Sequence, residues 1–138
     1  MRVLVVDDSA LIRNILKSIF AETADISVAG EASNGQAAAE MVKSLKPDLV
    51  LMDINMPVMN GLEATEKIMK ESPLPICIFS NDTESDYSMK ALGKGALEVL
   101  RKPDIDRMND PEFLRTFLER LRALSKVNVK VPSKTTAR

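Results

Sequence analysis

Short apolar runs alternate with stretches of helical periodicity along this chain, and the alternation restricts its possible folds more than any other feature. Residues 3–6 (VLVV) form a continuous apolar run rich in β-branched residues, which is typical of a strand buried on both faces. From Leu11 to Phe20, apolar pairs recur every four residues, which predicts a helix with one buried face. Strands are expected at residues 3–6, 26–31, 48–52, 76–79 and 97–100, and helices at about 11–20, 35–46, 61–71, 83–94 and 113–124.

Five strand–helix units in succession predict an α/β fold, a doubly wound, five-stranded parallel sheet with five helices. With 138 residues, of which 45 % are hydrophobic, the chain has the size of one domain with a packed interior. Residues 1–125 are expected to form this domain. Residues 126–138 carry four basic residues and no acidic one, and are expected to be a flexible tail or the start of an interdomain linker. Sheets of this kind bind ligands beyond the carboxyl ends of their strands.

The chain contains no histidine, and this absence excludes several kinds of chemistry. Ser-His-Asp and Cys-His nucleophile pairs, histidine-ligated zinc and a phosphohistidine all need the missing imidazole. A net charge of −1 favours neither nucleic acid nor a membrane as a partner. A single cysteine, no recognisable leader and no apolar run long enough to span a bilayer make the cytoplasm the expected location.

Polar residues follow four of the five expected strands. Asp7 and Asp8 follow the first strand, Asp53 the third, Ser80 the fourth and Lys102 the fifth. Because parallel strands end at a common edge of the sheet, we expect these residues to converge. Close carboxylates stay ionised only with compensating charge, which Lys102 and a hard divalent cation such as Mg²⁺ would supply. A carboxylate in such a cavity can accept a phosphoryl group as an aspartyl phosphate.

The motifs around these residues resemble the bacterial response-regulator receiver domain. The resemblance covers residues 1 to about 125 and rests on VLVVDDSALIRNIL, PDLVLMDINMPVMNGLEA, Ser80 and the Lys102–Pro103 pair. DDSALIR and DINMPVMNGLEATEKIMKE look most like the receivers of chemotaxis protein-glutamate methylesterases. The resemblance implies a flavodoxin-like strand order, 2-1-3-4-5, and a phosphorylation-dependent switch of a two-component, chemotaxis-type pathway.

The resemblance implies a phosphoacceptor and a metal site. Asp53 would accept the phosphoryl group from a histidine kinase and would also bind the metal. Asp8 would bind Mg²⁺ directly and Asp7 through a water molecule, with the main-chain carbonyl of Asn55 as a further ligand. The chain would then catalyse only its own phosphotransfer and dephosphorylation, and would not be an enzyme in the ordinary sense.

The resemblance also implies the parts of a switch. Ser80 would hydrogen-bond a phosphoryl oxygen in the active state, and Lys102 would form an ion pair with the phosphoryl group. The peptide bond before Pro103 would be cis. The side chains of Asn55 and Asp82 would tune the lifetime of the phosphoryl group, which is expected to last minutes or less.

One position departs from the family pattern. The family usually has an aromatic residue three positions before the lysine, where this chain has Val99. Valine has few rotamers and no hydroxyl, so the usual coupling between serine and aromatic residue cannot operate in the same way. Tyr87 is either a substitute or a surface aromatic. Output is expected through the fourth helix, fifth strand and fifth helix, toward a downstream protein or a linked effector domain.

Other function classes remain open at this point. A metal-dependent phosphohydrolase usually has a second aspartate two residues after its nucleophile, where this chain has Asn55. A nucleotide- or flavin-binding domain would carry a glycine-rich G-x-G-x-x-G after the first strand, which is missing here. A pseudo-receiver that only binds partners would not need the full acidic set. Within the favoured interpretation, the chain is either a complete single-domain regulator or the regulatory N-terminal part of a chemotaxis methylesterase.

Overall fold

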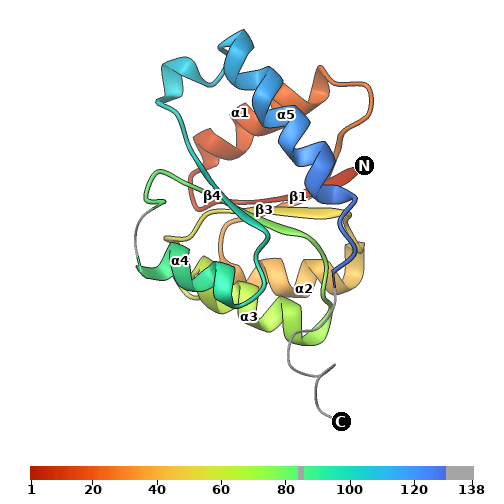
Figure 1. The fold of residues 1–138 in the computed structure, drawn as a ribbon, viewed down its shortest axis with the longest axis vertical. Helices are drawn as coiled ribbons and strands as arrows, with labels where there is room; N and C mark the ends of the chain where they lie inside the picture. The colour runs from red at the N-terminus through yellow and green to blue at the C-terminus, as the bar shows by residue number, and fades with distance from the viewer. Residues whose placement is uncertain (84–85, 130–138) are drawn as a thin grey trace.

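A parallel sheet lies at the centre of this computed structural model, which describes residues 1–83 and 86–129 (Figure 1). Within those residues the five strands lie in the order β2-β1-β3-β4-β5, and all neighbouring strands pair in parallel. Their bounds are β1 Arg2–Val6, β2 Ser27–Ala32, β3 Leu49–Met52, β4 Ile76–Ser80 and β5 Glu98–Arg101. The predicted α/β class and the flavodoxin-like strand order are confirmed.

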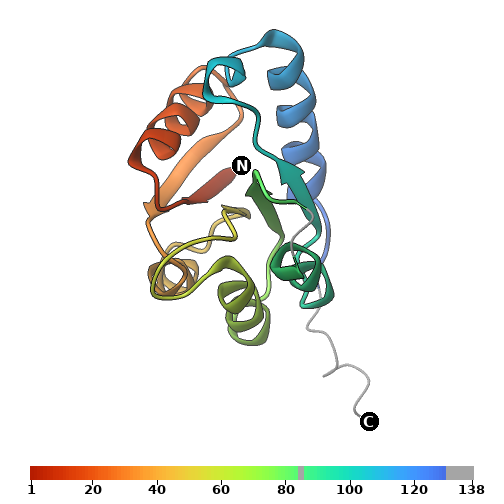
Figure 2. The ribbon, with the colours of Figure 1, turned by 90° about the vertical axis from the view of Figure 1, so that its left-hand side faces the viewer.

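Helices cover both faces of the sheet. Figure 2 views the molecule from the side where β1 and β3 end, with α1 and α5 above the sheet and α2, α3 and α4 below it. Their bounds are α1 Ala10–Ala21, α2 Gly35–Leu45, α3 Gly61–Glu71, α4 Asp86–Gly93 and α5 Pro111–Ser125. No helix in the described part of the chain is both long and apolar enough to cross a membrane.

Polar side chains cap the helices that begin near the carboxyl edge of the sheet. The caps of α1, α2, α3 and α5 are Ser9, Asn34, Asn60 and Asp110. At α3 the cap is reciprocal, because Asn60 accepts from the N–H of Glu63 and Glu63 accepts from the N–H of Asn60. Such a cap is worth about 1 kcal/mol. It fixes where the loop after β3 ends.

The sheet separates two apolar cores. In β1, Leu4 and Val6 belong to the core beneath α2, α3 and α4, whereas Val3 and Val5 belong to the core beneath α1 and α5. This alternation explains why a strand buried on both faces is apolar throughout. In the second core, the Phe117 ring of α5 lies 5.1 Å from that of Phe79 in β4.

Two local features differ from the sequence-based expectation, and the predicted tail is described only in part. Helix α4 is described from Asp86, whereas Thr83 lies in a turn, and residues 84–85 of the predicted helix lie outside the described residues. A short 3₁₀ helix, Ile105–Arg107, follows β5 and had not been expected. Residues 126–129 form neither helix nor strand, and the rest of the predicted tail, residues 130–138, lies outside the described residues.

Strand register brings the chemically active residues to one edge of the sheet. Val6 pairs with Met52, and Met52 pairs with Ile78, so β1, β3 and β4 end near the same level. The backbone ladder continues just past these ends, where the N–H of Asp53 donates to the carbonyl of Val6 at 2.9 Å. The first residues after neighbouring strands therefore meet.

Candidate functional site

Three carboxylates gather at the carboxyl edge of the sheet. Asp7 and Asp8 follow β1, Asp53 follows β3, and one oxygen from each lies within 4.8 Å of the others. Asp7 and Asp53 are buried, whereas Asp8 is exposed. The predicted convergence of these three residues is present in the structure. Oxygen atoms at this spacing are a suitable donor set for a hard divalent cation, so the residues present fit Mg²⁺.

Lys102 bridges the two buried carboxylates. Its Nζ lies 2.6 Å from Asp7 Oδ2 and 3.3 Å from Asp53 Oδ2. Only 9 % of the Lys102 side chain is exposed, so its ammonium compensates the acidic charge in a largely water-excluded place. The backbone N–H of Lys102 donates to the carbonyl of Ser80 at 3.0 Å, which sets where the lysine leaves the sheet.

Asp53 has an environment that works against its own charge. Burial raises the pKa of Asp53 above its ordinary range, the Lys102 ammonium lowers the pKa, and the Asp7 carboxylate raises it. The N–H of Ile54 donates to Asp53 Oδ1 at 2.7 Å and also favours the ionised form. A second positive charge beside Asp53 would complete the compensation that Lys102 provides only in part.

The loop between β3 and α3 packs directly on Asp53. A Cβ atom at Gly61 would overlap the main-chain carbonyl oxygen of Asp53, and the N–H of Gly61 donates to the carbonyl of Ile54 at 2.9 Å. At the top of the loop, the N–H of Met59 donates to the carbonyl of Pro57, which closes a γ-turn around Val58 with φ +68°. Sequence reasoning missed Gly61, because Gly after an N-cap has no local signature of a close backbone approach.

Ser80 lies at the end of β4 and is fully buried. Its Oγ accepts a hydrogen bond from the N–H of Asp82 at 3.1 Å. Across the described residues, the structure records no hydrogen bond between Ser80 Oγ and Asp53. Asn55 and Asp82 are exposed, and their effects on the lifetime of a phosphoryl group remain predictions.

One expected feature is wrong. The described residues contain no cis peptide bond, so the bond before Pro103 is trans. For a residue before proline, the trans form is favoured by about 0.5–1 kcal/mol in the absence of other constraints. Lys102 contacts both Asp7 and Asp53 with this trans bond, so the ion pairs do not require the cis form.

Val99 and Tyr87 occupy different environments. Val99 lies in β5 opposite Ile78, and its side chain packs against the core under α2, α3 and α4. Tyr87 is 51 % exposed on α4. The tyrosine is therefore a surface aromatic in this structure, in line with one of the two interpretations that the sequence leaves open.

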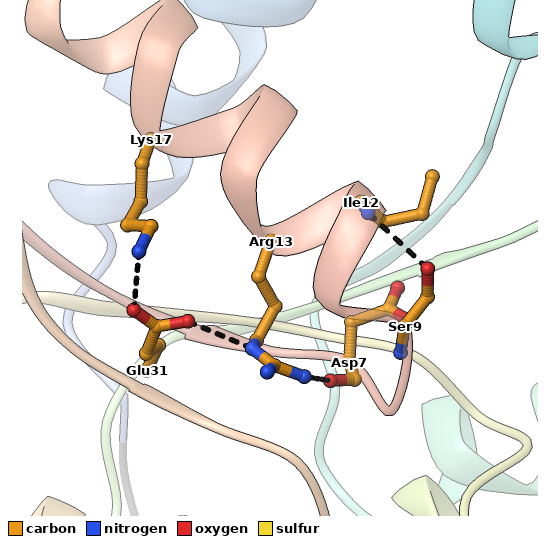
Figure 3. Close-up of polar contacts among 6 residues, drawn as sticks. All are labelled: Asp7, Ser9, Ile12, Arg13, Lys17 and Glu31. Carbon is orange, nitrogen blue, oxygen red and sulfur yellow. Dashed lines mark hydrogen bonds and ion pairs between the residues drawn. The ribbon is translucent and has the colours of Figure 1, made fainter.

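Arg13 is a further residue at the site that sequence reasoning did not identify. Its Nη1 donates to the main-chain carbonyl of Asp7 at 2.7 Å, from the second turn of α1 (Figure 3). The N–H of Ser9 donates to Asp7 Oδ1 at 2.9 Å. An arginine in a helix gives no local signal of such a contact, because the contact depends on how α1 packs beside β1.

The response regulator receiver domain family matches residues 3–110 of this chain. Among curated relatives, the protein-glutamate methylesterase/protein-glutamine glutaminase of Bdellovibrio bacteriovorus is 40 % identical over 132 residues, which are 94 % of this chain and 37 % of that protein. The corresponding Idiomarina loihiensis protein is 42 % identical over all of this chain and 36 % of its own length. The chain thus spans little more than a third of these relatives, and the match lies in their receiver region.

Solved structures give the same picture. The response regulator domain of Thermotoga maritima CheB has a TM-score of 0.85 and 38 % identity, covering 93 % of this chain and 98 % of that one. A CheX-CheY-BeF3-Mg complex from Borrelia burgdorferi has a TM-score of 0.75 and 25 % identity, covering 89 % of this chain and 87 % of that one.

Proposed function

The chain belongs to the response regulator receiver domain family, and on that premise we propose that Asp53 is the phosphoacceptor of a signalling switch. One observation carries the proposal. Asp53 lies beside Asp7, Asp8 and Lys102 at the edge of the sheet where β1 and β3 end. This arrangement supports nucleophilic attack by a carboxylate on phosphorus, since cationic groups neutralise charge on the transferring phosphoryl oxygens.

In the proposed step, an Asp53 carboxylate oxygen forms a bond to phosphorus. The phosphorus–nitrogen bond to the donor's phosphohistidine breaks, and its electron pair stays on the imidazole. No residue of these 138 can be the donor, because they include no histidine, and we assign the donor histidine to a histidine kinase. Lys102, already 3.3 Å from Asp53, would follow the phosphoryl oxygens as an ion-pair partner.

We assign the metal ligands to Asp8, Asp53 and the Asn55 carbonyl, with Asp7 contributing through water. Support for the indirect role of Asp7 is that both of its carboxylate oxygens already have partners. Oδ1 accepts from the N–H of Ser9, and Oδ2 contacts Lys102. Asp8 is the exposed member of the acidic set. When bound, Mg²⁺ would neutralise charge on the carboxylates and on the phosphoryl group.

The switch is best described as a population shift. Phosphorylation would favour a conformation in which Ser80 Oγ leaves the N–H of Asp82 and bonds a phosphoryl oxygen. We propose that α4, β5 and α5 carry the change to a partner. With Val99 packed in the core in place of a mobile aromatic residue, the change would travel through the β4–α4 segment.

The names and lengths of the relatives suggest which effector and pathway this receiver serves. Since they are named methylesterase/glutaminase and are almost three times as long, we propose that this receiver regulates a linked effector of that kind in a cytoplasmic chemotaxis pathway. A complete single-domain regulator is the alternative. A phosphohydrolase finds no support among the relatives, and Asn55 occupies the place of its second aspartate.

Phosphodonor labelling tests the central proposal. The wild-type protein, Asp53→Asn and Asp48→Asn would be incubated with radiolabelled acetyl phosphate and Mg²⁺. Asp48 is a matched control, because it is an exposed aspartate at the opposite end of β3. We expect label on the wild type and on Asp48→Asn, and its loss with Asp53→Asn or on removing Mg²⁺. Equal labelling of Asp53→Asn would contradict the assignment.

A further inference from the structure

Asp7 is held at each of its four polar atoms. Its N–H donates to the carbonyl of Ala32 at 3.0 Å, Oδ1 accepts from Ser9 N–H at 2.9 Å, and Oδ2 contacts Lys102 at 2.6 Å. The fourth contact is the 2.7 Å hydrogen bond from Arg13 Nη1 to the main-chain carbonyl. This bond ties the backbone of Asp7 itself to a side chain of α1.

Arg13 is itself anchored on a neighbouring strand. Its Nε donates to Glu31 Oε1 in β2 at 2.7 Å, and Lys17 binds the other Glu31 oxygen from the next turn of α1 (Figure 3). The Arg13 side chain is 18 % exposed. Hydrogen bonds from Lys17 and Arg13 hold the pKa of Glu31 below its ordinary range, so this carboxylate is ionised at neutral pH.

A planar guanidinium suits this position. It presents several N–H donors in a fixed geometry, so one side chain can bind the Glu31 carboxylate and the Asp7 carbonyl together. A lysine ammonium is a point charge on a flexible stem and holds no such geometry. Arg13 therefore joins α1, β2 and the turn that carries Asp7 and Asp8.

We propose that Arg13 is a positioning residue for the metal site, held in place by Glu31 and Lys17. Its recorded contact with this site is the main-chain carbonyl of Asp7, and through it Arg13 fixes the turn that presents the Asp7 and Asp8 carboxylates. Groups that orient metal ligands commonly change metal affinity by about 10–100-fold when removed. The inference rests on the proposed function, since it assumes that a divalent cation binds there.

A titration with Mg²⁺ alone tests the role, followed through the backbone amide NMR signals of residues 7–9. For Arg13→Gln we expect the Mg²⁺ Kd to rise about tenfold. Labelling by acetyl phosphate at saturating Mg²⁺ should stay near the wild-type rate, because Arg13 touches none of the reacting groups. Arg13→Lys keeps the charge, and we expect it to bind Mg²⁺ almost as weakly as Arg13→Gln.

Arg122→Gln is the matched control. Arg122 Nε contacts Asp25 Oδ2 at 2.7 Å, the same distance as in the Arg13–Glu31 pair, and joins α5 to the turn before β2. It lies on α5 and has no recorded contact with Asp7, Asp8 or Asp53 among the described residues. We expect an unchanged Mg²⁺ Kd for this variant.

The outcomes separate the two levels of the proposal. If the wild type binds Mg²⁺ and Arg13→Gln binds it equally well, the positioning role is overturned and the metal site stands. Wild-type affinity in Arg13→Lys would overturn positioning in favour of charge alone. If the wild type fails to bind Mg²⁺, the metal site itself is wrong, and the role of Arg13 with it. Should Arg13→Gln not fold, Glu31→Gln, which loosens the anchor only, should raise the Kd about two- to threefold, and an unchanged Kd would overturn the proposal.

Discussion

The backbone conformation at two positions sets the path of the loop beside Asp53. Gly61 is in contact with the Asp53 main chain, and Val58 holds a γ-turn with φ +68° at the top of the same loop. Neither residue bears a reacting group. Both determine where the loop after β3 runs, and therefore where the backbone of Asn55 lies relative to the carboxylates.

Replacing Gly61 should disturb this loop. In Gly61→Ala the new methyl group would overlap the Asp53 carbonyl oxygen, which is backbone and cannot move aside cheaply. We expect a loss of about 2–3 kcal/mol in the free energy of unfolding, as for other substitutions that force strain into a packed region. Urea denaturation would measure it.

Gly93→Ala is the matched control for that change. A Cβ atom at Gly93, the last residue of α4, would meet nothing within 4 Å. This variant should be neutral or up to about 1 kcal/mol more stable, because alanine favours the helix. Equal losses in the two variants would show that the contact with Asp53 is not the cause.

Val58 offers a prediction of the opposite sign. A β-branched residue at positive φ is strained, and Val58 is 83 % exposed, so little packing is lost when it is replaced. We expect Val58→Gly to stabilise the fold by about 1 kcal/mol in thermal or urea unfolding. Val127→Gly, at an exposed valine outside the helices and without positive φ, should be neutral or destabilising. A destabilised Val58→Gly would contradict the strain argument.

At the scale of elements, the helices differ in how firmly they are attached. Helix α2 buries four of its residues, Gly35, Ala38, Ala39 and Val42. Helix α4 is shorter and buries only Ser88 and Ala91, while Tyr87, Met89 and Leu92 are exposed. Few buried contacts mean a low local free energy of opening, which suits an element that must shift.

We therefore expect α4 to respond most to activation. Beryllofluoride with Mg²⁺ should change amide hydrogen exchange in α4 more than in α2, measured by mass spectrometry. Asp53→Asn should remove the response, since the ligand then has no carboxylate to bind. An equal or larger change in α2 would exclude α4 as the principal moving element.

At the scale of the whole molecule, the site places function and stability in opposition. Burial raises the pKa of Asp53, so its ionised form is less favourable in the folded chain than in the unfolded chain. Below the ordinary pKa of 3.8, Asp53 is protonated in both states and the folded chain keeps its full stability. That stability falls as the pH rises through the raised pKa of the folded chain, where Asp53 ionises. A cation that binds the folded state would offset this loss.

Urea unfolding without metal, measured from below pH 3.8 to neutral pH, would test whether stability falls as the pH rises. The wild type should lose stability relative to Asp53→Asn as the pH rises, because the amide has no charge to bury. At neutral pH, Mg²⁺ should return much of the stability that the wild type has lost. Asp106→Asn, at an exposed aspartate in the 3₁₀ turn, should follow the wild-type profile. Parallel profiles for wild type and Asp53→Asn would refute the expectation.

Much of this protein can be derived from its sequence, because the information is local. The VLVV run and the four-residue period of α1 each depend on neighbours in the chain. Apolar runs of this kind place both ends of every strand within one residue of the bounds in the structure. The rule that parallel strands end at one edge then brings Asp7, Asp53 and Lys102 together.

Other features were decided only by tertiary packing. Arg13 reaches the Asp7 carbonyl because α1 lies beside β1 and β2, and Gly61 is required because a loop closes on Asp53. Periodicity and spacing describe which residue types face inward, but a close contact between backbone and a distant side chain depends on how whole elements pack. The sequence by itself thus determined the fold and the acidic site, and the packing determined how firmly that site is held.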